Sequence, residues 1–121
     1  MKSAAFGLTA LALAPWPVQA FAHHSFAMFD TSHTVTLHGT VKEFQWTNPH
    51  AWIMLTVAKD GQSQLWAVEM MGPSGLAHQG WTQNTLQPGM PITVSVHPLR
   101  NGSKGGQFVS VTLPNGTRKG H

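Results

Sequence analysis

The feature that most limits the fold of this chain is a series of five short β-prone runs separated by turn residues. The runs cover residues 34–46, 51–59, 63–71, 91–97 and 107–113. In the first run, polar residues alternate with an apolar set that includes Val35, Leu37 and Val41, which predicts a strand with one buried face. Gly39 lies within that set and predicts a bulge or bend in the strand.

The order of the elements favours one architecture. Asp60-Gly61 predicts a tight hairpin turn between the second and third runs, and residues 73–78 predict a short helix that ends before Gly80. Three strands, a short helix and two more strands make up the element order of a five-stranded OB barrel. We therefore predict an all-β fold of this OB-like type. A β-sandwich fragment or an open meander is the competing architecture.

The first 22 residues have the layout of a secretory signal peptide. Lys2 gives a positive start, residues 4–14 form an unbroken apolar run, and the stretch up to Ala22 ends in small residues. The apolar run is too short to span a bilayer, so we expect no stable membrane insertion after cleavage. We expect cleavage after Ala22, with Ala20 as the second choice, and release into the periplasm or outside the cell. An uncleaved membrane anchor is the alternative.

The length that remains suits one domain and is too short for two. We assign residues 23–113 to a single OB-like β domain. Residues 114–121 are polar, and we expect them to form a flexible tail.

Composition argues against several classes of function. The chain of 121 residues has no cysteine, so neither disulfides nor thiolate metal sites are available. Its seven lysines and arginines are scattered rather than clustered, which argues against a nucleic-acid partner. It has four carboxylates and no motif of a nucleotide-binding or hydrolytic enzyme, so we do not expect an enzyme.

Two adjacent histidines stand where the mature chain is expected to begin. Cleavage after Ala22 would expose the amine of His23, which can chelate a metal together with its own imidazole, followed by His24. Cleavage after Ala20 would put His23 third, which is the arrangement of an amino-terminal copper or nickel site. Such nitrogen donors suit copper(II). Further donors could come from His38 and His50, and also from His33 and Met28. The alternative is a pair of solvated histidines without a function.

A second candidate site is the turn between the first two strands. Asn48-Pro49-His50 is flanked by Trp46 and Trp52, and in an OB barrel this loop borders the usual ligand face. Aromatic rings beside an amide and an imidazole could hold a small polar or sugar-like ligand. The predicted ligand-binding set is Trp46, Asn48, His50, Trp52, Glu69 and Trp81. The alternative is structural packing, in which a buried Glu69 would need a partner such as His50.

Several stretches together resemble a known family. They are His23-His24-Ser25-Phe26, the Trp-Thr-Asn-Pro-His core at 46–50, Trp66 with Glu69, and Gly80-Trp81. This pattern is similar to the bacterial family of small exported proteins numbered 6152 among the domains of unknown function. The resemblance spans about residues 23–113 and implies export and a single β domain, without an activity. His97 departs from the familiar pattern, so no site is assigned to it.

These observations give three expectations for function. The first is a periplasmic binding protein that carries or delivers copper or another divalent metal through His23 and His24, with His50 or His38. Another periplasmic protein is its candidate partner. The second is a small-ligand or carbohydrate-binding module. The third is a protein-interaction module without a small ligand.

Overall fold

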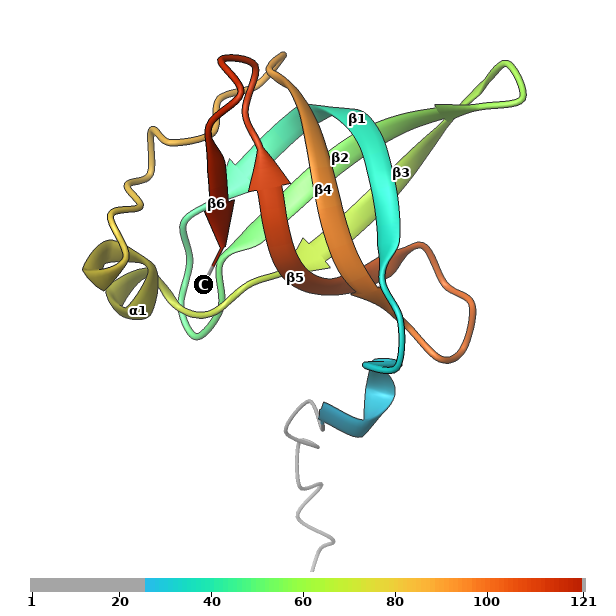
Figure 1. The fold of residues 1–121 in the computed structure, drawn as a ribbon, viewed down its shortest axis with the longest axis horizontal. Helices are drawn as coiled ribbons and strands as arrows, with labels where there is room; N and C mark the ends of the chain where they lie inside the picture. Colours follow the sequence, from blue (N-terminus) through green and yellow to red (C-terminus); the bar gives the residue numbers. More distant parts are fainter. Residues whose placement is uncertain (1–25, 121) are drawn as a thin grey trace, which may run out of the picture.

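The computed structural model describes residues 26–120, which form a closed barrel (Figure 1). The elements are the 3-10 turn η1 (Phe26–Met28), the strands β1 (Val35–Gln45), β2 (Trp52–Lys59) and β3 (Gln62–Glu69), the helix α1 (Pro73–His78), and the strands β4 (Pro91–Pro98), β5 (Gly105–Thr112) and β6 (Arg118–Gly120). The short helix between β3 and β4 lies where the sequence predicted it. The predicted signal peptide, residues 1–22, lies outside the described residues.

Two pairings of β1 and one parallel pairing close the barrel. β1 is antiparallel to β4 over residues 35–40 and to β2 over residues 40–45, so one long strand joins both halves of the sheet. The barrel closes where β3 runs parallel to β5, with Ala67 opposite Gly105 and Glu69 opposite Gln107. The ring of strands is therefore β1-β2-β3-β5-β4, which confirms the predicted five-stranded OB-like barrel.

The irregularity in β1 is not where the sequence predicted it. Val41 lies opposite Leu55 and Glu43 lies opposite Met54, so the extra residue of the bulge is between Val41 and Glu43, not at Gly39. Gly39 serves another purpose. A Cβ added there would be 2.6 Å from the carbonyl oxygen of Thr56, so the small residue allows β1 and β2 to approach each other closely as they begin to diverge.

The predicted hairpin between β2 and β3 is confirmed. Asp60 and Gly61 both have positive φ angles, 52° and 76°, as a type I′ turn requires. Lys59 and Gln62 pair directly on either side of this turn.

One hydrophobic core fills the barrel, made of Leu37, Val41, Ala51, Ile53, Leu55, Val68, Met70, Leu76, Trp81, Leu86, Ile92, Val94, Val96, Phe108 and Val111. Leu76 from α1, with Trp81 and Leu86 from the segment after it, joins this core, and each is at most 1% exposed. Among residues 26–120, no helix has the length and apolar character needed to cross a membrane.

The chain after Pro114 differs from the predicted flexible tail. It turns back and forms β6, which pairs with the end of β5. The indole Nε1 of Trp81 donates a hydrogen bond of 3.3 Å to the carbonyl oxygen of Gly120, and the Lys119 Nζ lies 5.6 Å from the centre of the same indole. The folded domain therefore extends to Gly120 rather than ending at residue 113.

Candidate functional site

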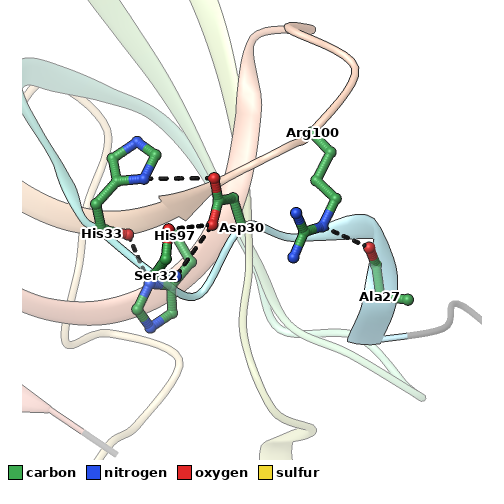
Figure 2. A network of polar contacts seen from close by, with 6 residues as sticks. All are labelled: Ala27, Asp30, Ser32, His33, His97 and Arg100. Carbon is green, nitrogen blue, oxygen red and sulfur yellow. Dashed lines mark hydrogen bonds and ion pairs between the residues drawn. The ribbon is translucent and has the colours of Figure 1, made fainter.

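The start of the described chain is fastened to the segment that follows β4. The backbone N–H of Arg100 donates to the carbonyl oxygen of Met28 at 2.9 Å, and the Arg100 side-chain Nε donates to the carbonyl oxygen of Ala27 at 3.0 Å. The backbone N–H of Asp30 donates to the carbonyl oxygen of Pro98 at 2.8 Å. These bonds fix the exit of the N-terminal segment beside one end of the barrel (Figures 1 and 2).

Two histidines lie at this junction. His33 precedes β1 and His97 is near the end of β4, and the pairing of Val35 with Val96 brings these two strand ends together. The Nδ1 of His97 donates to the carbonyl oxygen of His33 at 3.0 Å (Figure 2). Because a carbonyl oxygen can only accept, Nδ1 carries the proton, and the neutral ring keeps a lone pair on Nε2.

The His33 imidazole lies near a carboxylate. Its Nδ1 is 3.5 Å from Oδ2 of Asp30, and the His33 side chain is 56% exposed. Asp30 stays ionised because Ser32 donates to its Oδ1 from the side-chain hydroxyl at 2.6 Å and from the backbone N–H at 3.0 Å. These bonds, helped by the positive charge of Arg100, hold the pKa of Asp30 below its ordinary value.

A second histidine–carboxylate pair lies in the loop between β1 and β2. The Nδ1 of His50 donates to the carbonyl oxygen of Met70 at 2.7 Å and is 3.6 Å from Oε1 of Glu69. Glu69 is only 6% exposed, so the sequence argument that a buried Glu69 would need a partner such as His50 is confirmed. The His50 side chain is 40% exposed, so its ring is partly open to solvent.

The predicted ligand-binding residues differ in burial and in their contacts. Trp46 is half-buried and packs edge-on against Phe44, with ring centres 5.7 Å apart. Asn48 is exposed in a cis Asn48–Pro49 turn, and Trp52 begins β2 opposite Glu69.

Trp81 is part of the core. It is 1% exposed, and its ring lies 5.6 Å from that of Phe108 in a T-shaped contact. This indole has no free face on which a sugar or another ligand could stack, so its predicted role in ligand binding is wrong.

The structure also separates His38 from His50. His38 lies on the outer side of β1, where its Nδ1 shares a hydrogen bond of 3.1 Å with the hydroxyl of Thr93. It borders a hollow beside Ala58, whereas His50 precedes Trp52 at the other end of β2, roughly 20 Å away at about 3.3 Å per residue. The two imidazoles therefore cannot bind one ion together, and they remain alternative ligands, as the sequence analysis offered them.

No complete metal centre is formed by the described part of the chain. Within residues 26–120, no three His, Asp or Glu side chains lie close enough together to hold an ion. The other two predicted ligands, His23 and His24, lie outside the described residues. Of the histidines in residues 26–120, His33 and His97 lie at the junction of η1 with the end of β4.

Two hollows lie elsewhere on the barrel. A groove of about 730 Å³ is lined by His38, by several threonines and a serine, and by apolar residues such as Ile92 and Leu113. A smaller hollow of about 300 Å³ lies between the start of β1 and the β2–β3 hairpin. Neither hollow is lined by Trp46, Asn48 or Trp52.

Comparison with known proteins identifies the family. The model of a family of unknown function, DUF6152, matches residues 11–108, which is most of the chain. This chain belongs to DUF6152. The matched region includes both histidine–carboxylate pairs and ends within β5, so β6 lies beyond it. No curated protein and no solved structure gives a significant match.

Sequence reasoning considered His33 and set His97 aside, although the structure joins them. The predicted barrel topology already indicated that His33 and His97 lie close together. In an OB barrel the first and fourth strands are antiparallel neighbours, so a residue just before the first strand meets the end of the fourth. His97 was judged by its motif rather than by its place in the barrel.

Proposed function

We propose that this protein is an exported carrier of a divalent transition metal, with copper(II) as the first candidate. The site would combine the amine and imidazole of His23, or the imidazole of His24, with His33 and His97. The observation that carries the proposal is the anchoring of η1 beside His33 and His97, whose Nδ1 atoms are both engaged. Cleavage of the signal peptide would deliver the protein to the periplasm with its N-terminal amine free.

Chain length supports this combination of ligands. A chain advances at most about 3.6 Å per residue, so the Cα of His24 is within roughly 7 Å of the Cα of Phe26, where η1 begins. The bonds between η1 and Arg100 keep that starting point at the end of the barrel where β1 begins and β4 ends. His38 and His50 have no such relation to η1.

The state of the two imidazoles also supports it. A histidine that binds a metal through one ring nitrogen commonly donates the other N–H to a carboxylate or a backbone carbonyl. His33 faces the Asp30 carboxylate, and His97 donates to a carbonyl oxygen. Both rings can therefore offer Nε2, and a set of nitrogen donors without thiolates suits copper(II).

The proposal is tested by copper(II) titration of the processed protein against a chelator of known affinity. We expect His33→Ala and His97→Ala each to weaken binding by about tenfold or more, since losing one imidazole removes a ligand or its support. His78→Ala is the matched control, because His78 also donates its Nδ1 to a carbonyl oxygen, that of Ser74, but within α1.

The outcomes separate the candidate sites. Affinity lost in the His33 and His97 variants and kept in His78→Ala supports the proposed site. Wild-type affinity in both His33→Ala and His97→Ala contradicts it. In that case, loss of affinity in His50→Ala would move the site to the His50–Glu69 pair.

A further inference from the structure

The β2–β3 hairpin extends beyond the rest of the barrel (Figure 1). The ladder between β1 and β2 ends at Thr40 and Thr56, yet β2 continues to Lys59. From Gly39 back to Val35, β1 pairs with β4 instead. The two strands therefore diverge, and the hollow of about 300 Å³ occupies the space between them.

This hollow has an apolar wall. Val35, Leu37, Val57 and Trp66 line it, and they come from β1, β2 and β3. Leu37 is buried and the other three are partly buried against the core, so the hollow opens at the mouth of the barrel rather than on its outer face. Small-ligand sites are typically hollows of about 300–1,000 Å³ with apolar walls and few polar groups, and the mouth of a β-barrel is a common place for them.

One polar atom in this wall has no partner. The Nε1 of Trp66 is buried, and no acceptor lies within hydrogen-bond distance of it among the described residues. Burying an N–H donor without an acceptor is unfavourable, and such groups are rare in folded proteins. This nitrogen is covered by protein, so an oxygen atom of a ligand would supply the missing acceptor only where the side chains around Trp66 move aside.

The rim of the hollow favours an acid. Lys59 lines it and forms no ion pair within residues 26–120, while Gln64 and His38 add further polar groups. No carboxylate lines the hollow, because Asp60 follows Lys59 in the turn but is not part of the lining. A ligand with an apolar body and a carboxylate would match this distribution of charge.

We propose that the barrel mouth is a binding site for a small amphiphilic acid. Its apolar body would lie against Val57 and Trp66, and its carboxylate would face Lys59. The site is independent of the proposed metal centre, because it shares no residue with His33, His97 or η1.

The test compares three eight-carbon probes, octanoate, octanol and octylamine, by calorimetry on the processed protein in the presence of a metal chelator. We expect octanoate to bind one molecule per chain and octylamine to bind at least about fivefold more weakly, because only octanoate can pair with Lys59. Lys59→Gln should bring octanoate affinity down to that of octanol. Trp66→Phe keeps a six-membered aromatic ring but removes the N–H donor together with the five-membered ring, and should also weaken octanoate binding.

Lys42→Gln is the matched control, since Lys42 is an exposed lysine at the bulge of β1 and does not line the hollow. Circular dichroism checks that each variant is folded. The proposal is overturned if octanoate does not bind at millimolar concentration, if octylamine binds equally well, or if folded Lys59→Gln binds octanoate as the wild type does.

Discussion

The five histidines of residues 26–120 all use Nδ1 for their contact with the rest of the chain. These residues are His33, His38, His50, His78 and His97. In three of them the partner is a backbone carbonyl, which fixes the proton on Nδ1 and leaves Nε2 as the free nitrogen of the neutral ring. His33 and His97 differ from the other three histidines in their position beside η1, not in the contacts of their rings.

A pH-dependent effect is predicted for Asp30. Hydrogen bonds from Ser32 lower its pKa in the folded protein below the ordinary value of 3.8. The unfolded chain then binds the proton more readily, so the stabilisation is fully present above pH 3.8 and is lost as the pH falls through the folded-state pKa. Asp30→Asn should therefore lower the Tm slightly at pH 7 and make no difference at the lowest pH at which both proteins fold.

This prediction is checked by thermal unfolding of metal-free protein across that pH range. Ser32→Ala should reproduce part of the effect, because it removes only the hydroxyl donor. A Tm difference that stays constant down to acidic pH would show that the Asp30 charge does not stabilise the fold.

Single residues also show what sequence can and cannot reveal. The Glu69–His50 contact could be predicted because a buried carboxylate needs a partner and few are available. The burial of Trp81 could not, because a tryptophan after a turn can equally stack on a ligand or fill a core. Its position depends on Phe44, Phe108 and β6, which are all distant in sequence.

At the level of elements, the sequence predicted features that depend on neighbouring residues, and it did not predict features that depend on how strands pair. The Asp60-Gly61 hairpin follows from the φ angles that two residues can adopt. The bulge in β1 depends on how Val41 and Glu43 align with Leu55 and Met54, so β1 alone does not determine it. β6 was missed for a related reason, since its three residues are polar and become a strand by pairing with β5.

The close approach at Gly39 predicts a large effect from a small change. In Gly39→Ala the new Cβ would meet the Thr56 carbonyl oxygen at 2.6 Å and Leu55 Cγ at 2.8 Å, so β1 and β2 must move apart. We expect a loss of about 1–3 kcal/mol in the free energy of unfolding. Gly120→Ala is the control, because its Cβ would come no closer than 3.4 Å to any atom.

Urea unfolding of both variants measures this difference. Equal stability of Gly39→Ala and Gly120→Ala would mean that the strands separate at Gly39 without cost, which would contradict the close packing described here.

The role of β6 leads to a second prediction at this scale. A chain that ends at Leu113 loses the Trp81–Gly120 hydrogen bond and the Lys119 contact, and it leaves the edge of β5 uncovered. We expect this truncation to lower the Tm by several degrees. Lys119→Gln alone should have a smaller effect, since a single cation–π contact contributes about 0.5–2 kcal/mol depending on how far it is desolvated. An unchanged Tm in the truncated chain would mean that β6 does not stabilise the fold, as expected for the flexible tail that the sequence predicted.

At the level of the whole molecule, the core and the two candidate sites occupy different parts of one barrel. Leu76, Trp81 and Leu86 complete the core, the hairpin side carries the hollow around Trp66, and the junction of η1 with the end of β4 carries His33 and His97. The sequence was sufficient for the barrel because element order and turn residues specify it. The sequence alone could not predict the distance between His38 and His50. That distance depends on the point at which β1 stops pairing with β2 and pairs with β4 instead.

The most direct test of the central claim is the copper(II) affinity of the processed protein, with its first residue identified by mass spectrometry, compared with a version that carries one extra glycine ahead of it. We predict tight binding of one ion by the processed chain and a loss of about tenfold or more in the extended chain, because the N-terminal amine is displaced. Weak binding that the extra residue does not change would contradict the account of this protein as a metal carrier.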